Sequence, residues 1–421
     1  MTVDFILVGS AVLLAAYVVD IAARHWHFPA ILVLLAAGLL GNVFLSDQQV
    51  RQTIDTALPV LGTLGLILIV LEASLDLDVH WGNLSRLAQA LLAAIVATVG
   101  LSFVLGMGMV WFLGMNQYQA GLLAIPLAVV SSAVAIPAAQ RLGDEAREFI
   151  TYESAFADII GVLLFYSWLG SGGVATGFAV SLLGGGLATI AISVVFVLGL
   201  YLLMNRLTGH VRFVPMMAGL LLLYSTGKAL NLSPLLLVLA FGLFLSNLPS
   251  LQRRSRLLRR WGSEDFPQTT KEFKAQVTEF TFAVRSIFFI LLGLWTDLAS
   301  LLAIESMGLA AVILICIYLI RWPILWLVRA PLRQGLVWVS PRGLITVLLI
   351  LIAFDQTDLS AKAFPTGAVM WVVLVSSAMV LLTGRRPQDA LFAKAQGDES
   401  VAGCGTASDG VAQPTGDDRQ G

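Results

Sequence analysis

Two carboxylates, Glu153 and Asp158, stand at the head of the apolar segment "FITYESAFADIIGVLLFYSW", residues 149–168. An ionisable side chain near the centre of a bilayer costs roughly 2.5 to 3.5 kcal/mol, so each one needs a partner or a task. At helical pitch the two acids diverge by about 140°, whereas Ser154 and Asp158 share one face of the helix. We therefore expect the acids to meet different neighbours, so that one is neutralised permanently while the other is free to exchange its charge.

Further charged residues lie inside apolar segments elsewhere in the chain. They are Glu72, Arg285, Arg321 and Arg342. Taken singly, each could form a structural ion pair or cap a helix at the interface. Because these charges converge on a few spans and coincide with breaks in others, the set favours a polar functional site inside the membrane.

The composition predicts an integral membrane protein. The chain has 421 residues, of which 58% are hydrophobic and 12% are charged, and its mean hydropathy is +0.88. Runs of about 18 or more apolar residues recur along most of its length, which indicates membrane helices rather than a barrel of alternating strands. The net charge of −1 gives no support to nucleic-acid binding. No cluster of His or Cys points to a resident metal or cofactor.

We predict an all-α polytopic fold with thirteen transmembrane helices. Their expected positions are about 4–22, 28–46, 56–75, 88–113, 117–138, 150–169, 178–203, 211–227, 233–248, 278–297, 306–328, 336–354 and 364–383. When loops are assigned alternately to the two sides, one side receives Arg51, Lys228 and Lys362, and the other receives all remaining basic residues outside the spans. The positive-inside rule then puts the N-terminus outside and the C-terminus in the cytoplasm.

The spans are expected to form one transmembrane domain, residues 1–383, followed by a tail. Residues 384–421 are mostly small, polar and acidic, including "GDESVAGCGTASDGVAQPTGDDRQG", and this composition is typical of a disordered segment. We therefore expect a disordered cytoplasmic tail and no regulatory domain after the membrane part.

Two of the predicted spans contain helix-breaking residues. The fifth, "LLAIPLAVVSSAVAIPAAQ", has Pro126 and Pro137, and the twelfth, "VWVSPRGLITVLL", has Pro341, Arg342 and Gly343. Proline removes a backbone hydrogen bond and kinks or interrupts a helix. Spans seven apart cross the membrane in opposite directions, so this pair is expected from an inverted repeat of helices 1–6 and 8–13. Transporters built in this way place their ion site where the unwound segments meet.

Six short motifs occur in order along residues 4–383. They are "FPAILVLLAAGLLGN", "LGLILIVLEASLDLDV", "ESAFAD", "SIFFILLGLWTDL", "LIRWPILWLV" and "SPRGLI". Together they resemble the cation:proton antiporter superfamily, and "ESAFAD" is similar to the Glu-Ser-x-x-Asn-Asp signature of its electroneutral branch. The resemblance implies secondary active transport, in which a monovalent cation, Na⁺ or Li⁺, is exchanged for H⁺ across the cell inner membrane. It also implies a homodimer and no enzymatic activity.

The resemblance implies a task for each candidate site residue. Asp158 is expected to bind the monovalent cation or the proton, assisted by Ser154, Glu72, Ser131 and Ser132. Glu153 is expected to form a structural ion pair with Arg321. The second broken helix is expected to rest on Pro341, Arg342 and Gly343.

The chemistry of these residue types favours one-for-one exchange. Burial disfavours a charged carboxylate, whereas a nearby cation favours it, so a desolvated Asp158 holds either a proton or a cation. Arginine is not deprotonated in proteins, so Arg321 releases no proton during the cycle. Asp158 alone would then exchange charge, and transport by alternating access would be electroneutral.

Two departures from the electroneutral pattern leave alternatives open. Ser131, Ser132 and Ala133 are closer to the Ser-Ser-Thr-Ala of the potassium-linked branch, which makes K⁺/H⁺ exchange the main alternative. Ala157 replaces the Asn or Asp that usually precedes the exchanging aspartate. A gated cation channel and an intramembrane aspartyl enzyme are further alternatives, but the chain shows no filter sequence and only one central membrane Asp.

Overall fold

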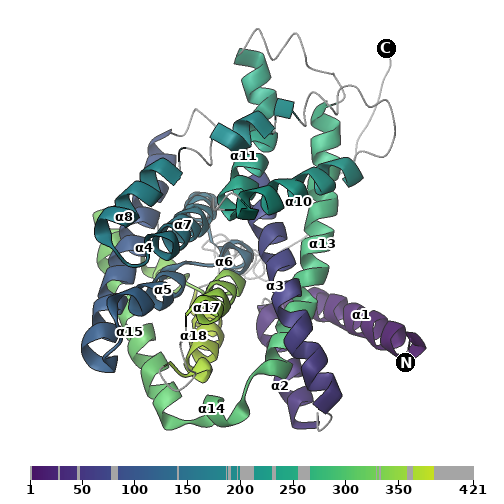
Figure 1. The fold of residues 1–421 in the computed structure, drawn as a ribbon, viewed down its shortest axis with the longest axis vertical. Helices are drawn as coiled ribbons and strands as arrows, with labels where there is room; N and C mark the ends of the chain where they lie inside the picture. Colours follow the sequence, from purple (N-terminus) through teal and green to yellow (C-terminus); the bar gives the residue numbers. More distant parts are fainter. Residues whose placement is uncertain are drawn as a thin grey trace, which may run out of the picture.

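The computed structural model of the protein contains helices and no strands in the part of the chain that it describes (Figure 1). That part comprises residues 2–26, 29–44, 48–76, 84–139, 142–185, 187, 191–196, 198–199, 213–229, 234–254, 266–328, 330, 333–357 and 364–383. The helices form two groups, which we call the packing bundle and the core bundle. The short helix α14 (Leu298–Leu302) runs between them at the bottom of Figure 1.

The packing bundle is centred on a long helix that touches two others over much of its length. Its helices are α1 (Thr2–Trp26), α2 (Ala30–Phe44), α3 (Gln48–Asp76), α10 (Phe213–Ala229), α11 (Pro234–Arg254) and α13 (Phe266–Trp295). Helix α13 packs against α2 and α3, and α11 packs against α3. A Cβ atom on Gly38 would lie 2.2 Å from the Ile290 carbonyl oxygen, so the backbones of α2 and α13 are in direct contact.

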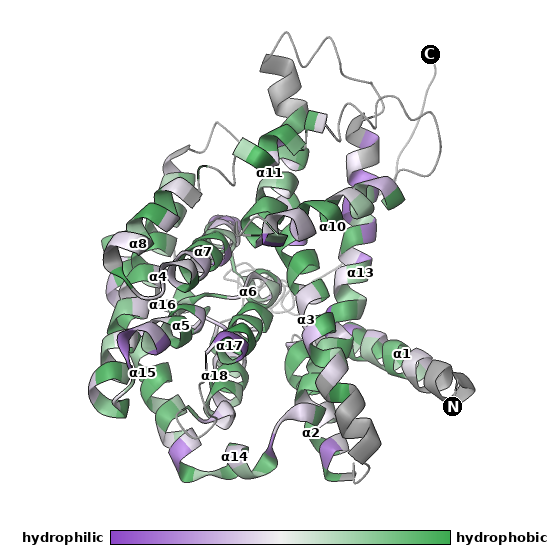
Figure 2. Cartoon of the chain, in the orientation of Figure 1, coloured by the Kyte–Doolittle hydropathy of each residue, from purple (hydrophilic) through white to green (hydrophobic). Residues whose placement is uncertain are grey.

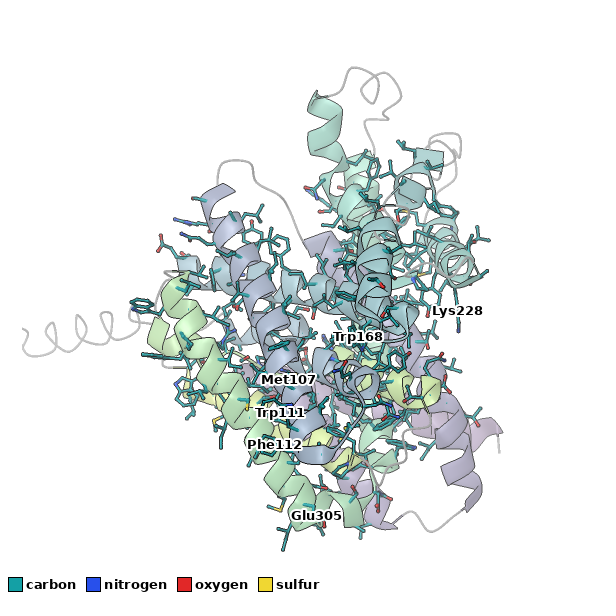
Figure 3. The ribbon with its side chains drawn as sticks, turned by 60° about the vertical axis from the view of Figure 1, so that its left-hand side comes forward. Met107, Trp111, Phe112, Trp168, Lys228 and Glu305 are labelled. Carbon is teal, nitrogen blue, oxygen red and sulfur yellow. The ribbon has the colours of Figure 1, made fainter. Side chains whose placement is uncertain are left out.

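The core bundle contains the remaining helices. They are α4 (Leu84–Leu113), α5 (Gln117–Ala128), α6 (Ser132–Ala139), α7 (Asp144–Ser171), α8 (Ala175–Val180) with the π-helical turn η2 (Ser181–Gly185), α15 (Ile304–Leu327), α16 (Arg333–Leu336), α17 (Leu344–Gln356) and α18 (Thr366–Met379) with η3 (Val380–Leu382). Helix α4 packs against α5, α7 and α15. Figure 3 shows Met107, Trp111 and Phe112 following one another along α4, beside α15 with Glu305 near its start.

Helix α14 is attached to the core bundle, whereas Thr296, two residues before it, is attached to the packing bundle. The side-chain amide of Asn42 in α2 donates to the Thr296 carbonyl at 2.7 Å. The indole N–H of Trp371 in α18 donates to the Leu301 carbonyl of α14 at 2.8 Å. Between these attachments, the Asp297 carboxylate caps α14 by accepting two main-chain N–H groups.

The described helices are apolar enough to span a membrane. Six stretches of 18 residues or more qualify by length and composition, in α3, α4, α5–α6, α7, α13 and α15, and shorter apolar helices accompany them. Figure 2 shows hydrophobic colouring along most of each helix. Large apolar side chains face outward, including Trp111 at 76% exposure and Phe112 at 87%, which is expected where lipid replaces water. The protein is a multi-pass membrane protein, as predicted.

The predicted spans agree with the helices in position but not always in length. Helix α13 begins at Phe266, well before the predicted residue 278. The prediction started late because the first turns of this helix are polar and only its apolar part indicates a membrane span. Helix α7 likewise begins at Asp144 with acidic residues in its first turn. The predicted seventh span, 178–203, lies partly outside the described residues, and the predicted tail, 384–421, lies wholly outside them.

Candidate functional site

The fifth predicted span consists of two helices, α5 and α6, separated by Val129, Val130 and Ser131. Pro126 lies inside α5 and Pro137 inside α6, so the break falls between the two prolines. Val129 has an extended backbone and donates its N–H to the Pro126 carbonyl at 3.4 Å, which turns the chain out of α5. All three residues of the break are buried, so their main-chain polar groups need partners other than water.

The second break lies before α17, and it crosses the first. Helix α16 ends at Leu336, and α17 begins only after Gly343. The Ser131 N–H donates to the Pro341 carbonyl at 2.9 Å, so the two non-helical segments are in contact. A Cβ atom on Gly343 would lie 2.3 Å from Ser131 Oγ, which leaves room for glycine alone. The prediction of two discontinuous, crossing helices is confirmed, although the helical part of the twelfth span starts later than expected.

Arg342 occupies the centre of this crossing and is fully buried. Its Nε donates to the Leu127 carbonyl at the end of α5, and its Nη1 donates to the carbonyl and the hydroxyl of Ser340, both at 3.0 Å. Its main-chain N–H donates to Ser376 Oγ of α18 at 2.9 Å. The last carbonyls of a helix lack helical partners and carry partial negative charge. The guanidinium therefore satisfies the open end of α5 and joins the two broken helices to each other, and the main-chain N–H of Arg342 joins them to α18.

Glu153 of α7 and Arg321 of α15 form a bidentate ion pair across the core bundle. Arg321 Nη1 lies 2.9 Å from Glu153 Oε1, and Nη2 lies 3.0 Å from Oε2. The third donor, Arg321 Nε, bonds to the Leu336 carbonyl at 3.1 Å. Both side chains are buried, with 1% exposure for Glu153 and 4% for Arg321. Parallel paired bonds of this kind are strong and directional, so the two charges neutralise each other in a fixed geometry.

Asp158 has the opposite environment, although it lies on the same helix. Its side chain is 3% exposed, and neither carboxylate oxygen has a hydrogen-bond partner among the described residues. The hydroxyl and N–H of Ser132 face it without completing a bond of ordinary geometry. It borders a small cavity, with room for about one water-sized particle. The lining residues are Val70, Ala73 and Ser74 of α3, Ala155, Asp158 and Ile159 of α7, and Leu239 of α11.

A comparison with protein families matches residues 9–384 to the family described as "Sodium/hydrogen exchanger, transmembrane". The chain belongs to this sodium/hydrogen exchanger family. It is therefore a transporter rather than an enzyme, and its activity is the exchange of a cation for a proton. None of the curated protein sequences matches it.

Solved structures show the same fold for the exchanger. The structure of the sodium proton antiporter MjNhaP1 from Methanocaldococcus jannaschii at pH 8 aligns with a TM-score of 0.68 and 18% identity, covering 91% of this chain and 95% of that one. An electron-microscopy structure of the same antiporter gives a TM-score of 0.65 and 18% identity, with coverage of 97% and 100%. The cation:proton antiporter resemblance expected from the sequence is thus confirmed.

The structure does not gather all of the sequence-predicted ion ligands of the exchanger in one place. Asp158 of α7 faces Ser132, the first residue of α6 after the break. Ser154 lies one turn before Asp158 on α7, and its hydroxyl donates to the Ile150 carbonyl at 2.7 Å. Glu72 is half-buried on α3, but Val70, Ala73 and Ser74 share the face that lines the cavity, so Glu72 lies on a different face.

Two further positions of the exchanger are used for packing. Ser131 contributes its N–H to the crossing and its carbonyl to the first turn of α6, where it accepts from Ala135 at 2.9 Å. Ala157 is buried in an apolar cluster that includes Val130 and Ile324. The small side chain at position 157 therefore fills space beside the first break.

Sequence reasoning missed Ser74, the second polar side chain of the cavity. It lies two residues after Glu72 in "LEASLDLDV", where the acid drew attention first. At helical spacing, Ala73 and Ser74 share the face of Val70, whereas Glu72 does not.

Proposed function

We propose that this exchanger moves one Na⁺ or Li⁺ against one H⁺, and that both ions bind in turn at Asp158. The observation that carries the proposal is the pair of buried Asp158 oxygens without hydrogen-bond partners among the described residues. A bare carboxylate in such a place is costly, whereas a proton or a hard cation removes the cost. Because one carboxylate accepts one or the other, binding of the cation releases the proton.

The surrounding residues suit a small, hard monovalent cation. Oxygen ligands are available from the Asp158 carboxylate, from the Ser132 hydroxyl that faces it and from Ser154 one turn away. The described residues hold no group of three or more His, Cys, Asp or Glu that could bind a metal ion in a fixed site. Because Glu72 lies on another face of α3 in this structure, we assign it no contact with the ion in this state.

We further propose that transport is electroneutral, because the second acid of α7 takes no part in the exchange. Glu153 is held by Arg321 through two hydrogen bonds, and arginine keeps its proton in proteins. The cation-loaded and proton-loaded sites then carry the same net charge.

The proposal places the exchanger in the cell inner membrane with its C-terminus in the cytoplasm, and the resemblance suggests a homodimer. The alternation of spans on which this orientation rests is supported at one end of the core bundle, where Arg86 near the start of α4 pairs with Glu145 and Glu148 near the start of α7 at 2.9 and 2.8 Å. Helices α4 and α7 therefore begin on the same side, as the alternation of the spans requires. Cysteine labelling of that side in intact cells would test the assignment.

The direct test is dissipation of a proton gradient in everted membrane vesicles after addition of Na⁺, Li⁺ or K⁺. We expect wild type to respond to Na⁺ and Li⁺, and Asp158→Asn to respond to none. Glu305→Gln, which alters an exposed carboxylate at the start of α15, is the matched control and should behave as wild type. Full activity in Asp158→Asn would remove Asp158 from the site.

Electroneutrality is tested separately, in proteoliposomes whose membrane potential is clamped with an ionophore. The cation gradient that balances a given proton gradient should be the same at every imposed voltage. A balance point that moves with voltage would contradict one-for-one exchange while leaving Asp158 as the binding residue.

K⁺/H⁺ exchange is the second candidate, supported by Ser131 and Ser132 in the first break. The match to a family described as a sodium/hydrogen exchanger favours Na⁺ over K⁺. A response to K⁺ that exceeds the response to Na⁺ in the same vesicles would reverse this preference.

A further inference from the structure

The cavity at Asp158 lies between the two bundles, and each bundle supplies one polar side chain to it. Asp158 comes from α7 of the core bundle, and Ser74 comes from α3 of the packing bundle. The other lining residues are apolar. A particle that fills this small space beside Asp158 therefore has Ser74 as the other polar residue of the lining.

The Ser74 hydroxyl has lone pairs to offer but no free proton. Its proton is donated to the Leu71 carbonyl of its own helix at 2.7 Å. A serine hydroxyl has one donor and two acceptor lone pairs, so the remaining capacity of Ser74 is that of an acceptor. Such an oxygen can bind a cation or accept the proton of a carboxylic acid, but it cannot stabilise a bare carboxylate.

The position of Ser74 is fixed by a close contact with α11. A Cβ atom on Gly242 would lie 1.7 Å from Ser74 Oγ, so the glycine leaves the space that the hydroxyl occupies. Leu239, one turn earlier on α11, lines the same cavity. Helices α3 and α11 thus hold the serine oxygen in place as parts of one bundle.

We propose that Ser74 Oγ is a ligand of the cation bound at Asp158, supplied by the packing bundle. This inference rests on the proposed function of Asp158. The Ser74 oxygen coordinates the cation in the cation-loaded site and accepts the Asp158 proton in the protonated site. In the empty site two acceptors border the same small space, so Ser74 disfavours the empty, ionised state and helps to couple the two ion movements.

The division of the ligands between two bundles predicts a difference between the two faces of the membrane. If the core bundle moves against the packing bundle during alternating access, Asp158 moves relative to Ser74. Ser74 lies in the last turns of α3, which end on the cytoplasmic face in the proposed orientation. Ser74 therefore contributes to cation affinity on that face and not on the opposite one.

The test compares KM for Na⁺ on the two faces, using everted and right-side-out vesicles that carry wild type, Ser74→Ala or Ser74→Cys. We expect both variants to raise KM roughly three- to tenfold in everted vesicles, because a water molecule replaces the lost oxygen only in part. Right-side-out vesicles should show no change. Ser74→Cys preserves the size of the side chain, but its softer sulfur is a poor ligand for a hard cation.

Two controls separate the possible reasons for failure. Thr281→Val removes another buried hydroxyl of the packing bundle, one that donates to Val277 at 2.7 Å and lies outside the cavity lining, and it should leave KM unchanged on both faces. Asp158→Asn should abolish exchange in both kinds of vesicle, and its failure to do so would overturn the proposed function itself. With Asp158→Asn inactive, an unchanged KM in both Ser74 variants, an equal rise on both faces or a rise confined to right-side-out vesicles would overturn the inference.

Discussion

Glu153 and Asp158 lie five residues apart on α7, and both are buried, but their carboxylates differ in their hydrogen-bond partners. Glu153 has both oxygens bonded to Arg321, which is in turn bonded to the end of α16. Asp158 has neither oxygen bonded to a described residue and faces a cavity at the boundary between the bundles. A buried charge whose hydrogen bonds are complete holds helices together, whereas one whose bonds are incomplete is ready to bind an ion.

This contrast predicts that stability and transport depend on different residues. Removing one partner of a buried ion pair leaves an uncompensated charge, and this is among the most damaging changes to a folded protein. Removing a carboxylate that has no hydrogen bonds removes no stabilising interaction from the folded state. Substitutions around α7 should therefore be ranked in opposite orders by stability and by transport.

The largest loss of stability is expected from Arg321→Met, which leaves Glu153 buried and unpaired. We expect a loss of about 3 to 5 kcal/mol in the free energy of unfolding, seen as a large fall in the melting temperature of the detergent-solubilised protein. The double variant Glu153→Gln/Arg321→Met should recover part of this loss, because it removes the orphaned charge. A single variant as stable as wild type would show that the ion pair is not structural.

A smaller loss is expected from Gly343→Ala, which tests the crossing beside Asp158. The added Cβ would overlap Ser131 Oγ, and overpacking of this kind typically costs about 1 to 3 kcal/mol. Gly108→Ala on α4 is the matched control, because a Cβ there meets nothing within 4 Å. If both variants melt at the same temperature as wild type, the two broken helices do not need their close contact.

A weaker effect still is expected from Arg86→Gln at the surface of the core bundle. Its pairs with Glu145 and Glu148 are exposed, so water and salt screen them, unlike the pair at Glu153. The small decrease in melting temperature should disappear at high salt. A decrease comparable to that of Arg321→Met would show that burial does not explain the strength of the Glu153 pair.

The smallest effect on stability is expected from Asp158→Asn, the substitution that should abolish transport. Because no hydrogen bond is lost and a buried charge is removed, the free energy of unfolding should not fall below that of wild type. Wild type should gain about 2.7 kcal/mol when Na⁺ is present at a hundred times its dissociation constant, and Asp158→Asn should gain nothing. At a fixed Na⁺ concentration, the stability gained by wild type should grow as pH rises, because fewer protons then compete with Na⁺ for the carboxylate.

The sequence was informative wherever a local pattern has a local cause. Apolar runs predicted the helices, and Pro126 and Pro341 predicted two discontinuous spans. The exact position of each break was harder to predict from the sequence, because it depends on contacts between distant segments. The Ser131 N–H, for example, bonds to the Pro341 carbonyl, more than two hundred residues away, at the point where both helices are interrupted.

The arrangement of residues around the candidate ion site could be predicted only in part, for the same reason. Asp158 and Ser154 could be placed on one face of α7 by spacing alone. Spacing along α7 gives no information about α3 and α11, whose packing at Ser74 and Gly242 closes the cavity. The importance of Glu72 was inferred from its charge, whereas the structure turns a different face of α3 toward Asp158.

The attachments on either side of Asp297 limit where the chain can bend if the bundles move as proposed. Thr296 is held to α2 by Asn42, and Leu301 is held to α18 by Trp371. Any relative rotation of the bundles along this connection must be absorbed by the backbone torsions of the few residues between them. Asp297 is therefore the residue about which the two bundles would rotate. Its carboxylate, which caps α14, orients that helix relative to α13.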